Sequence, residues 1–568
     1  MQWINKWRGT ASTKLAVLLI ALFFAWFIVA FLIYPNVNLL KTTFIIDGSL
    51  SLEAVNKLVS SSRAVQSLIN SFLLAVSLVM TVNIVGIFLV LVMNYFDIKG
   101  IRVLSLGYYT TLIYSGVVLV AGYKFLYGEQ GFLTNLLAGI FPGFDTGWFT
   151  GYGAVLFVMT FAITSNHVIF LSNAIKKVDY QTIEAAKSMG ASDFYIIRRV
   201  VLPVLKPTIF AVTILIFLIG LSATSAPLIV GGQDFQTINP MILTFAKSVT
   251  SRDIAAILSI VLGIATMVLL MFMQRMENNG NFISVSKVKS TIKKQKIENK
   301  WANALVHIAA YLLFVIYALP VVLIIIFSFT DTFSIENATL ALDHFTLDNY
   351  LLLFTDFSAF RPYFISIAYS AASAFIVVMI TLLVSRILQR HKNIYTQLLE
   401  YSMMIPWLLP STLIALGLIL TYDKPNSLLG NQVLTGSVWM LLVAYIIVQL
   451  PFTLRMLKAA FFTIDHSLEE AAKNLGASSM YTFRRILLPV ILPSTLAVMV
   501  LNFNNMLADY DLTVFLFQPL LEPLGIVIKS STDPQASTDA KALMLVYSVV
   551  LMVISSVALY FVYGRKSK

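Results

Sequence analysis

The chain has 568 residues, of which 58% are hydrophobic and only 12% are charged, and its mean hydropathy is +0.85. Soluble globular domains are about half apolar and about one quarter charged, so this balance indicates a protein with many membrane-spanning segments. The lack of cysteine excludes disulfides, thiolate metal sites and cysteine nucleophiles, and the net charge of +12 fits basic cytoplasmic loops better than a nucleic-acid-binding surface.

Apolar runs long enough to cross a bilayer recur along the whole chain. The first follows Lys6, Arg8 and Lys14, and we interpret it as a retained span because no small-residue cleavage pattern follows it. We predict helices, since lipid offers no partner to exposed backbone groups. The twelve predicted spans lie near 15–34, 68–95, 105–126, 148–171, 209–230, 254–273, 304–329, 364–385, 399–421, 437–454, 496–517 and 543–563.

Charged residues separate the loops into two sets. If both termini are cytoplasmic, the inner segments hold 29 of the 39 Lys and Arg residues, and the outer segments hold 17 of the 27 Asp and Glu residues. Lys and Arg concentrate in cytoplasmic loops, so we predict a multi-pass protein with both termini inside. Six spans in each half then make the halves parallel repeats rather than inverted ones.

A basic linker separates the two predicted repeats. We place the first repeat at 1–275, the linker at 276–302 and the second repeat at 303–568. The linker is polar and rich in lysine, without apolar periodicity, which predicts a flexible tether between the halves. Attraction to anionic lipid is the alternative interpretation.

One inner loop of each half carries the same short sequence. "EAAKSMGASDFYIIRRVVLP" begins at Glu184, and "EAAKNLGASSMYTFRRILLP" begins at Glu470, 286 positions later. Paired alanines followed by glycine predict a short helix that ends at Gly190 in one copy and at Gly476 in the other. A second short helix would carry the arginine pair, and the following proline would end or redirect it.

The start of each short helix carries candidate caps. Ser467 and Glu470 have the spacing of a capping box, whereas the first loop has Gln181 at the matching position and must use Asp179 or another cap. Helices this short are marginal alone in water, so each needs a surface to pack on. Two such loops in one compartment predict a partner with two equivalent surfaces.

The pattern Glu-Ala-Ala, three residues, Gly and a distal Leu-Pro resembles the cytoplasmic EAA loop of permease subunits of binding-protein-dependent ABC importers. The resemblance covers nearly the whole chain, as a fusion of two permease domains. It implies an all-α integral membrane protein with about twelve transmembrane helices in two parallel six-helix repeats of the type I ABC importer permease fold.

In that family the loop forms a coupling helix that seats in a groove of the ATP-binding subunit. The resemblance places this role at about 174–208 and 455–495. The matched positions are Glu184, Ala185, Ala186, Gly190, Arg198 and Pro203 in the first loop, and Glu470, Ala471, Ala472, Gly476, Arg484 and Pro489 in the second.

The resemblance also implies partners in a bacterial cytoplasmic membrane. These are two copies of an ATP-binding cassette subunit, which would hold ATP and Mg, and an extracytoplasmic solute-binding protein. The chain has no G-x-x-x-x-G-K-[ST] motif and no Gly-Lys dipeptide, and its five histidines lack H-x-x-x-H spacing. We therefore expect a transport subunit with no catalytic residues, metal site or cofactor of its own.

The cargo is less well specified. The fused layout, with "LPFTLRMLKAAFFTIDHSLEEAAKNLGAS" at 450–478, most resembles iron(III) importer permeases, so we expect ferric iron, with thiamine, polyamine or phosphonate as alternatives. The outer segments carry 10 basic and 17 acidic residues, which favours a cation over phosphonate. This preference is weak, because salt screens such charges within about 10 Å.

A twelve-helix secondary transporter is the alternative class of protein. It should carry ionisable residues deep in the bundle, because such residues are costly in lipid. Asp509 and Asp511, aligned with Ala223 and Ser225 of the first half, are the candidates. They could line a translocation pathway or lie at the margin of an outer loop.

Overall fold

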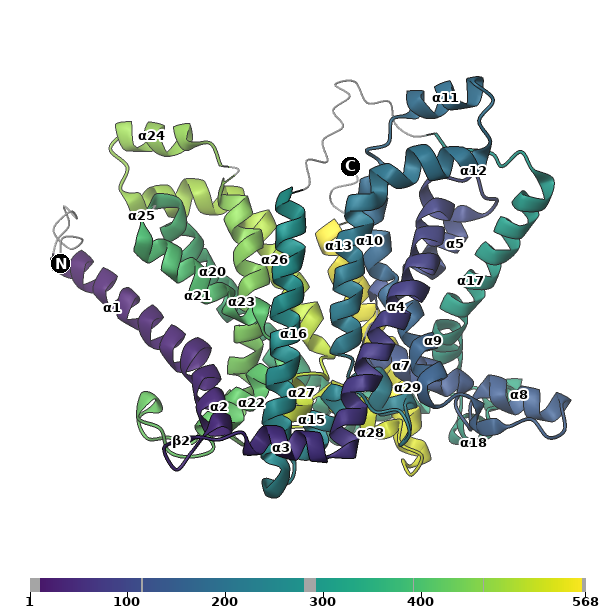
Figure 1. Cartoon of the computed structure of the whole chain (residues 1–568), viewed down its shortest axis with the longest axis horizontal. Helices are drawn as coiled ribbons and strands as arrows, with labels where there is room; N and C mark the ends of the chain where they lie inside the picture. The colour runs from purple at the N-terminus through teal and green to yellow at the C-terminus, as the bar shows by residue number, and fades with distance from the viewer. Residues whose placement is uncertain (1–10, 114–115, 280–292, 392, 463, 564–568) are drawn as a thin grey trace.

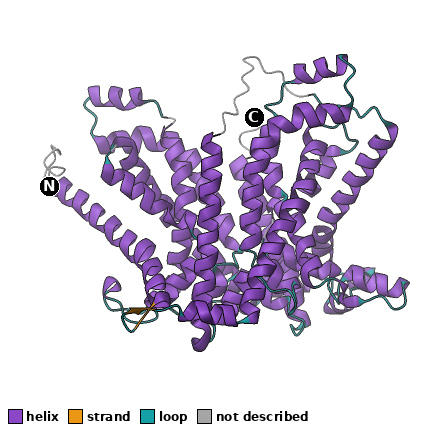
Figure 2. Ribbon diagram, viewed as in Figure 1, coloured by secondary structure: helices purple, strands orange, loops and turns teal. Residues whose placement is uncertain are grey.

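The computed structural model describes residues 11–113, 116–279, 293–391, 393–462 and 464–563, and most of them are helical (Figure 2). Within these ranges the strands are β1 (Ile45–Ile46) and β2 (Ser49–Leu50), which form one antiparallel pair. Figure 1 shows a bundle whose long helices run between two opposite ends, with α11 and α24 at the same end.

The α-helices of the first half are α1 (Ala11–Phe27), α2 (Tyr34–Phe44), α3 (Glu53–Ser60), α4 (Ser62–Asn94), α5 (Ile101–Tyr108), α6 (Thr110–Ile113), α7 (Val117–Tyr127), α8 (Phe132–Ile140), α9 (Gly151–Ile163), α10 (Ser165–Ile175), α11 (Tyr180–Ser188), α12 (Asp193–Ile196), α13 (Leu202–Leu221), α14 (Ser225–Val230), α15 (Ile238–Ala246) and α16 (Arg252–Asn279). Those of the second half are α17 (Lys300–Ser328), α18 (Thr332–Asn337), α19 (Asp348–Thr355), α20 (Phe357–Arg390), α21 (Ile394–Leu408), α22 (Ser411–Tyr422), α23 (Val438–Phe462), α24 (His466–Asn474), α25 (Ser479–Thr482), α26 (Leu488–Leu507), α27 (Thr513–Leu516), α28 (Leu524–Ser531) and α29 (Thr538–Tyr563). The π-helical turns are η2 (Ile28–Ile33), η4 (Ile197–Val201) and η8 (Phe483–Leu487), and the 3-10 turns are η3 (Thr146–Trp148), η5 (Val249–Ser251), η6 (Leu342–His344) and η7 (Ser427–Leu429).

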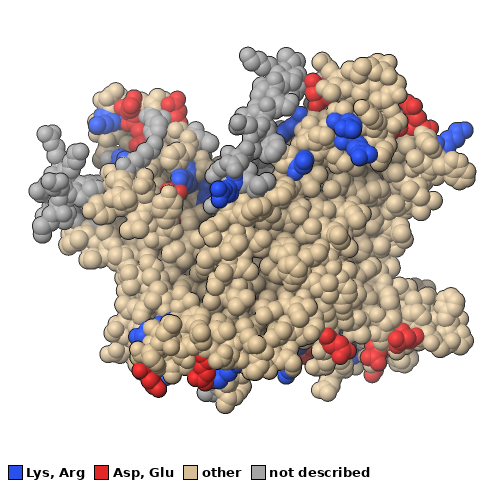
Figure 3. Space-filling view, in the orientation of Figure 1, with Lys and Arg blue, Asp and Glu red and all other residues tan. Residues whose placement is uncertain are grey.

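Ten helical segments of the described chain are long and apolar enough to cross a membrane. Two further pairs are bent, Ile101–Leu112 with Val117–Ile140 by 117° and Ile394–Leu408 with Ser411–Tyr422 by 105°, and they raise the number to as many as twelve. The prediction of an all-α membrane protein with about twelve spans is therefore confirmed. Figure 3 shows a broad band of uncharged residues between two charged ends, as a chain that crosses a bilayer requires.

The first helix of each half packs against the other half. In the first half, the Tyr108 hydroxyl of α5 donates to the Ala310 carbonyl of α17 at 2.7 Å. In the second half, the Tyr422 hydroxyl of α22 donates to the Ala30 carbonyl of η2. All four residues are buried, so each half completes the core of the other and the two repeats form one unit.

The predicted ends of two spans are wrong. The spans predicted at 209–230 and 496–517 end at Leu221 and Leu507, and the chain continues through a non-helical stretch into the separate short helices α14 and α27. These short helices lie inside the protein and are apolar, so hydropathy alone merges them with the preceding span. The breaks place polar side chains within the bundle.

Of the two predicted effects of each loop proline, to end or to redirect its helix, the first is wrong. Asp193–Leu221 and Met480–Leu507 are continuous helical segments that run through the prolines. A π-helical turn precedes each proline, and Pro203 and Pro489 fall in the first turn of α13 and α26. Each proline is tolerated because the π-helical turn before it already interrupts the regular hydrogen bonds of the helix, so the missing N–H costs little there.

The linker is not a flexible tether over its whole length. Gln295 is 7% exposed and pairs with the loop after α4: its N–H donates to the Tyr95 carbonyl at 2.7 Å, and its carbonyl accepts from the Asp97 N–H at 2.9 Å. Residues 280–292 of the linker lie outside the described residues. The described part after them is docked on the first half, because its backbone groups find partners there.

Candidate functional sites: the repeated loops and an axial cavity

The two repeated loops begin with the same cap. Asp179 Oδ1 accepts from the Gln181 N–H at 3.1 Å, and Asp465 Oδ1 accepts from the Ser467 N–H at 2.9 Å. The use of Asp179 is as expected. The capping box predicted for Ser467 and Glu470 does not form, because α24 begins at His466 and its N-cap is Asp465.

The two loops also end their first helix in the same way. Gly190 has φ +83° and Gly476 has φ +80°, and the Ala191 N–H donates to the Ala186 carbonyl at 3.0 Å. The corresponding bond of the second loop is 2.9 Å long. This is the Schellman geometry, in which a residue with positive φ satisfies the last helical carbonyls. A Cβ added at either glycine would meet nothing within 4 Å, so the backbone conformation alone explains the glycine.

The predicted loop residues divide into a buried and an exposed set. Ala186 is 7% exposed and Ala472 is 5% exposed, so both side chains are buried within the protein. The exposed members are Glu184, Ala185, Gly190, Arg198 and Pro203 in the first loop and Glu470, Ala471, Gly476, Arg484 and Pro489 in the second. Each short helix is thus attached along one side, and its glutamate and first alanine are open to a partner.

The attachment of the two short helices differs at one aligned position. Ile183 of α11 is fully buried in an apolar cluster. At the matching position of α24, Glu469 forms a bidentate ion pair with Arg386 of α20, with Nη1–Oε1 at 2.5 Å and Nη2–Oε2 at 2.8 Å. The side chains of Arg386 and Glu469 are 12% and 21% exposed. The carboxylate that holds α24 to α20 is therefore that of Glu469, the neighbour of Glu470 of the repeated motif.

The docked end of the linker contacts the first loop. The Glu298 N–H donates to Asp193 Oδ2 at 3.2 Å, and Lys293 Nζ lies 5.4 Å from the ring centre of Tyr180. Tyr180 also bonds to the Glu184 carboxylate and the Gln295 side chain, and the bond to Glu184 raises the pKa of Tyr180. This contact belongs to the first loop, because Tyr180 is replaced by His466 at the aligned position.

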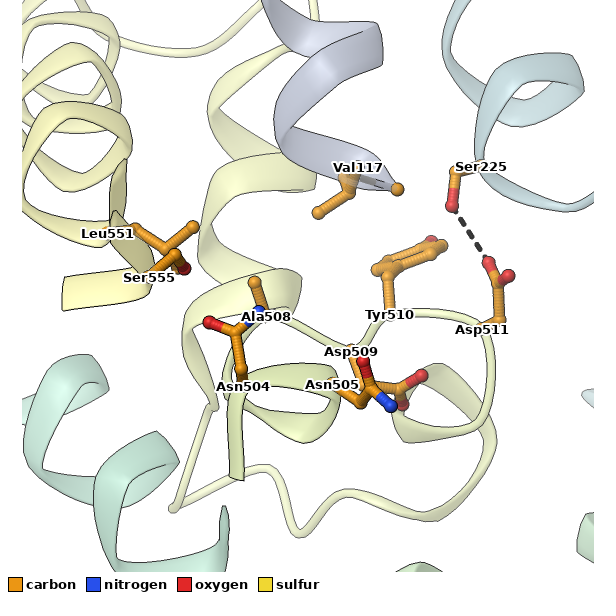
Figure 4. A pocket seen from close by; sticks show the side chains of 11 residues that line it. Val117, Ser225, Asn504, Asn505, Ala508, Asp509, Tyr510, Asp511, Leu551 and Ser555 are labelled. Atoms are coloured by element: carbon orange, nitrogen blue, oxygen red, sulfur yellow. Dashed lines mark hydrogen bonds between the residues drawn. The ribbon is translucent and has the colours of Figure 1, made fainter. Parts of the chain in front are cut away.

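A cavity of about 180 Å³ lies where the continuous helices of the two loops end. Its walls come from α7, α14, the end of α26 with the stretch after it, and α29, so both halves contribute (Figure 4). The lining residues are Gly116, Val117, Ser225, Asn504, Asn505, Ala508, Asp509, Tyr510, Asp511, Leu551 and Ser555.

The cavity lies on the axis that relates the two repeats. Ser225 Oγ donates to Asp511 Oδ1 at 2.8 Å (Figure 4), and the two residues are 286 positions apart, as are the two repeated loops. Equivalent positions of two parallel repeats can touch only next to their common axis. Thr224 bonds to the same carboxylate.

Asp509 is held beside Asp511 by the start of α27. Its Oδ2 accepts from the Thr513 N–H at 3.0 Å and from the Thr513 hydroxyl at 2.7 Å. Both aspartates line the cavity and are partly buried, so they lie in the bundle rather than in an outer loop. No Lys, Arg or His is among the lining residues that the structure describes, so no basic side chain lines the cavity beside the two aspartates.

Several residues of these sites are not identified by sequence reasoning. Asn504, Asn505 and Tyr510 line the cavity but belong to no motif. Arg386 and Gln295 meet their partners only through the fold. Alignment of the halves does reveal the exchange of Ile183 for Glu469, and an exchange at one position of a repeated motif is a usable indication.

The chain is similar to known transport proteins over most of its length. The family model described as binding-protein-dependent transport system inner membrane component matches residues 58–278 and 382–566. A probable ABC transporter permease protein of Sinorhizobium fredii is 39% identical over 552 residues, which cover 96% of each chain. A putative ferric transport system permease protein of Haemophilus influenzae is 22% identical and covers 86% of this chain and 76% of that protein.

Shorter matches extend the range of similar proteins. They include a putative 2-aminoethylphosphonate transport system permease protein of Salmonella paratyphi A and a probable sulfate transport system permease protein of Chlorella vulgaris, over 26% and 28% of this chain. A solved bacterial ABC transporter involved in the import of the acidic polysaccharide alginate is 18% identical, with a TM-score of 0.37, and the match covers 47% of this chain and 96% of that one.

Proposed function

The chain belongs to the family of binding-protein-dependent transport system inner membrane components, and we propose that it is the fused permease of an ATP-driven importer of ferric iron in a bacterial cytoplasmic membrane. In this proposal, α11 and α24 face the cytoplasm and each seats one of two ATP-binding cassette subunits, which hold ATP and Mg. A solute-binding protein docks at the opposite end of the bundle and delivers the cargo.

The observation that supports coupling is the continuity of two helices. The segment Asp193–Leu221 starts directly after the first loop and ends four residues before Ser225, and Met480–Leu507 joins the second loop to Asp509 in the same way. A helix of 29 residues is roughly 44 Å long. Closure of two partner subunits beneath α11 and α24 would therefore move the walls of the axial cavity through unbroken helices, in which the π-helical turns η4 and η8 are the places where the direction can change.

The matched loop residues keep separate roles in this proposal. Gly190 and Gly476 set the shape of each loop, whereas Ala186 and Ala472 allow close packing on the membrane helices. The partner would bind the exposed residues, which are Glu184, Ala185, Arg198, Pro203, Glu470, Ala471, Arg484 and Pro489.

Two observations support ferric iron as the cargo. One long match is a putative ferric transport system permease protein, and the axial cavity carries two carboxylates without a basic lining residue. Thiamine and polyamines are cationic alternatives. Phosphonate and sulfate, named in shorter matches, fit less well, because anions would face Asp509 and Asp511 without a compensating charge.

One feature also favours a second candidate function. Ionisable residues inside a membrane bundle are typical of secondary transporters, and Asp509 and Asp511 form such a pair. That class would transport without an ATPase, so the presence or absence of a partner separates the two candidates.

The test is reconstitution of the chain in vesicles with and without the co-purified ATP-binding subunit and solute-binding protein. We expect uptake of ferric iron that requires all three components and ATP. The double variant Gly190→Val and Gly476→Val should lose the ATP-binding subunit on purification while the chain still inserts in the membrane. Full uptake by the chain alone would refute the proposal and favour a secondary transporter.

A further inference from the structure

We propose that the axial cavity is a binding site for a cation, in which Asp509 and Asp511 supply the charge and Tyr510 and Asn504 supply further oxygen ligands. The inference deepens the proposed function, because the cation would be the cargo on its way through the permease. The binding step itself depends only on this chain.

The position of the cavity is the first argument. The bond between Ser225 and Asp511 places the cavity on the axis between the halves, and the wall from α7 belongs to the first half whereas that from α29 belongs to the second. Any motion of one half against the other changes such a cavity. A binding site at this place would therefore open and close with the transport cycle.

The second argument is a pair of polar groups that lack protein partners. Tyr510 is only 5% exposed and lines the cavity, and its hydroxyl has no hydrogen-bond partner among the described residues. The buried Asn504 Oδ1 also lacks a partner within the described part of the chain. A buried polar atom without a partner costs about 1–3 kcal/mol, so Asn504 Oδ1 points to a ligand that completes its bonding, and the Tyr510 hydroxyl is available to the same ligand.

The chemistry of the lining selects the ligand. Carboxylate, amide and hydroxyl oxygens suit hard cations, and they also accept hydrogen bonds from an ammonium group. With two aspartates and no basic residue among the described lining, an anion would be repelled. The Ser225 hydroxyl donates its hydrogen to Asp511, so its oxygen can still act as an acceptor.

The size of the cavity limits the class of ligand further. A volume of 180 Å³ corresponds to roughly six water molecules at about 30 Å³ each. This space accommodates a metal ion with part of its hydration shell or the ammonium end of a longer molecule. The shared requirement is a compact positive charge.

Cation binding by the purified full-length chain in lipid nanodiscs tests the inference. The two probes are Tb³⁺, as a hard trivalent metal ion, and 1,4-diaminobutane, as a source of ammonium groups. We expect at least one probe to bind with one site per chain, and the affinity to fall at least tenfold in Asp511→Asn and in Asp509→Asn. Glu522→Gln, which removes an exposed acidic residue elsewhere, is the matched control and should bind as the unmodified chain does.

A second variant keeps the test valid if the aspartate variants fail to fold. Tyr510→Phe removes one hydroxyl without changing the packing, and we expect a threefold or greater loss of affinity for the better probe. Equal affinity in Asp511→Asn and the unmodified chain, or no loss in Tyr510→Phe, would overturn the inference. These measurements need no ATP-binding subunit, so their failure leaves the proposed permease function standing, and a failed subunit pull-down would not affect them.

Discussion

The Ser225 hydroxyl and the Asp511 carboxylate, which occupy the same position in the two repeats, are joined by a 2.8 Å hydrogen bond. The offset of 286 positions between them is also the offset between Glu184 and Glu470. The same offset between the two repeats therefore pairs the loops at one end of the molecule and the two residues that meet at the axial cavity. Each loop continues as one helical segment toward that axis, and this continuity supports the coupling proposed above.

Exchange of the two axial residues should preserve their bond. Ser225→Asp alone places two carboxylates at bonding distance, and we expect it to cost at least about 2 kcal/mol, because a hydrogen bond to a charged group is lost and replaced by repulsion. Adding Asp511→Ser restores one hydroxyl and one carboxylate across the axis. Thermal unfolding of the purified chain should rank the double variant well above the single one, and equal stability of the two would contradict the axial contact.

The loop glycines should tolerate asparagine better than valine. Positive φ costs roughly 1–2 kcal/mol for an ordinary residue, whereas asparagine adopts this conformation more readily. Because a side chain at Gly190 meets no neighbouring atom, space does not limit the choice. We expect Gly190→Val to reduce recovery of the ATP-binding subunit severalfold and Gly190→Asn to reduce it little. Equal recovery with both variants would show that φ at this position does not control binding.

The ion pair between Arg386 and Glu469 should hold α24 in place. Glu469→Gln leaves a partly buried guanidinium without its charge partner, and we expect a loss of about 2–3 kcal/mol of local stability. Hydrogen exchange of the α24 amides should accelerate accordingly, with α11 unchanged as the internal control. Reversal of both charges, Arg386→Glu with Glu469→Arg, should recover part of the protection; if it recovers none, the loss does not arise from the pair.

The docked linker should stabilise the first loop but not the second. Gln295→Pro removes the N–H that bonds to Tyr95 and disturbs the approach to Tyr180. We expect faster hydrogen exchange in α11 and α12 with no change in α24. Lys300→Pro, at the first position of α17, is the matched control because a proline there needs no N–H partner. Equal hydrogen exchange of α11 in the unmodified chain and in Gln295→Pro would show that the contact with the linker does not stabilise the first loop.

The stability of helix α18 should depend on pH. Asp331 Oδ2 lies 2.7 Å from His344 Nδ1, and this bond raises the pKa of His344 above 6.5. The Ser334 backbone N–H, followed by His344, lowers the pKa of Asp331 below 3.8. The contribution of His344 to stability is fully present below pH 6.5 and is lost as the pH rises through the raised pKa of His344. The contribution of Asp331 to stability is present above pH 3.8 and is lost as the pH falls through the lowered pKa of Asp331.

Protection of the α18 amides, corrected for intrinsic exchange, should therefore be highest between about pH 4 and pH 6.5. Asp331→Asn retains a competent helix cap and should lose the pH dependence near the histidine pKa. The same pH profile in this variant and in the unmodified chain would exclude the ion pair as its cause.

The sequence by itself determined the features that depend on local composition. Apolar length predicts the number of spans, and an Asp, an Ala pair and a Gly predict the shape of each loop, because caps and Schellman turns are formed by residues within one helical turn. Hydropathy placed the ends of two spans wrongly, at 209–230 and 496–517, because buried short helices are as apolar as the spans beside them.

Only the tertiary structure decided which distant positions meet. The contacts of Ser225 with Asp511, of Arg386 with Glu469, and of Gln295 with Tyr95 join residues that no local pattern connects. Helices that are apolar on all sides carry no stripe to show which face packs inward, so their neighbours cannot be read from periodicity. The packing of the two halves sets these neighbours, and with them the axial cavity.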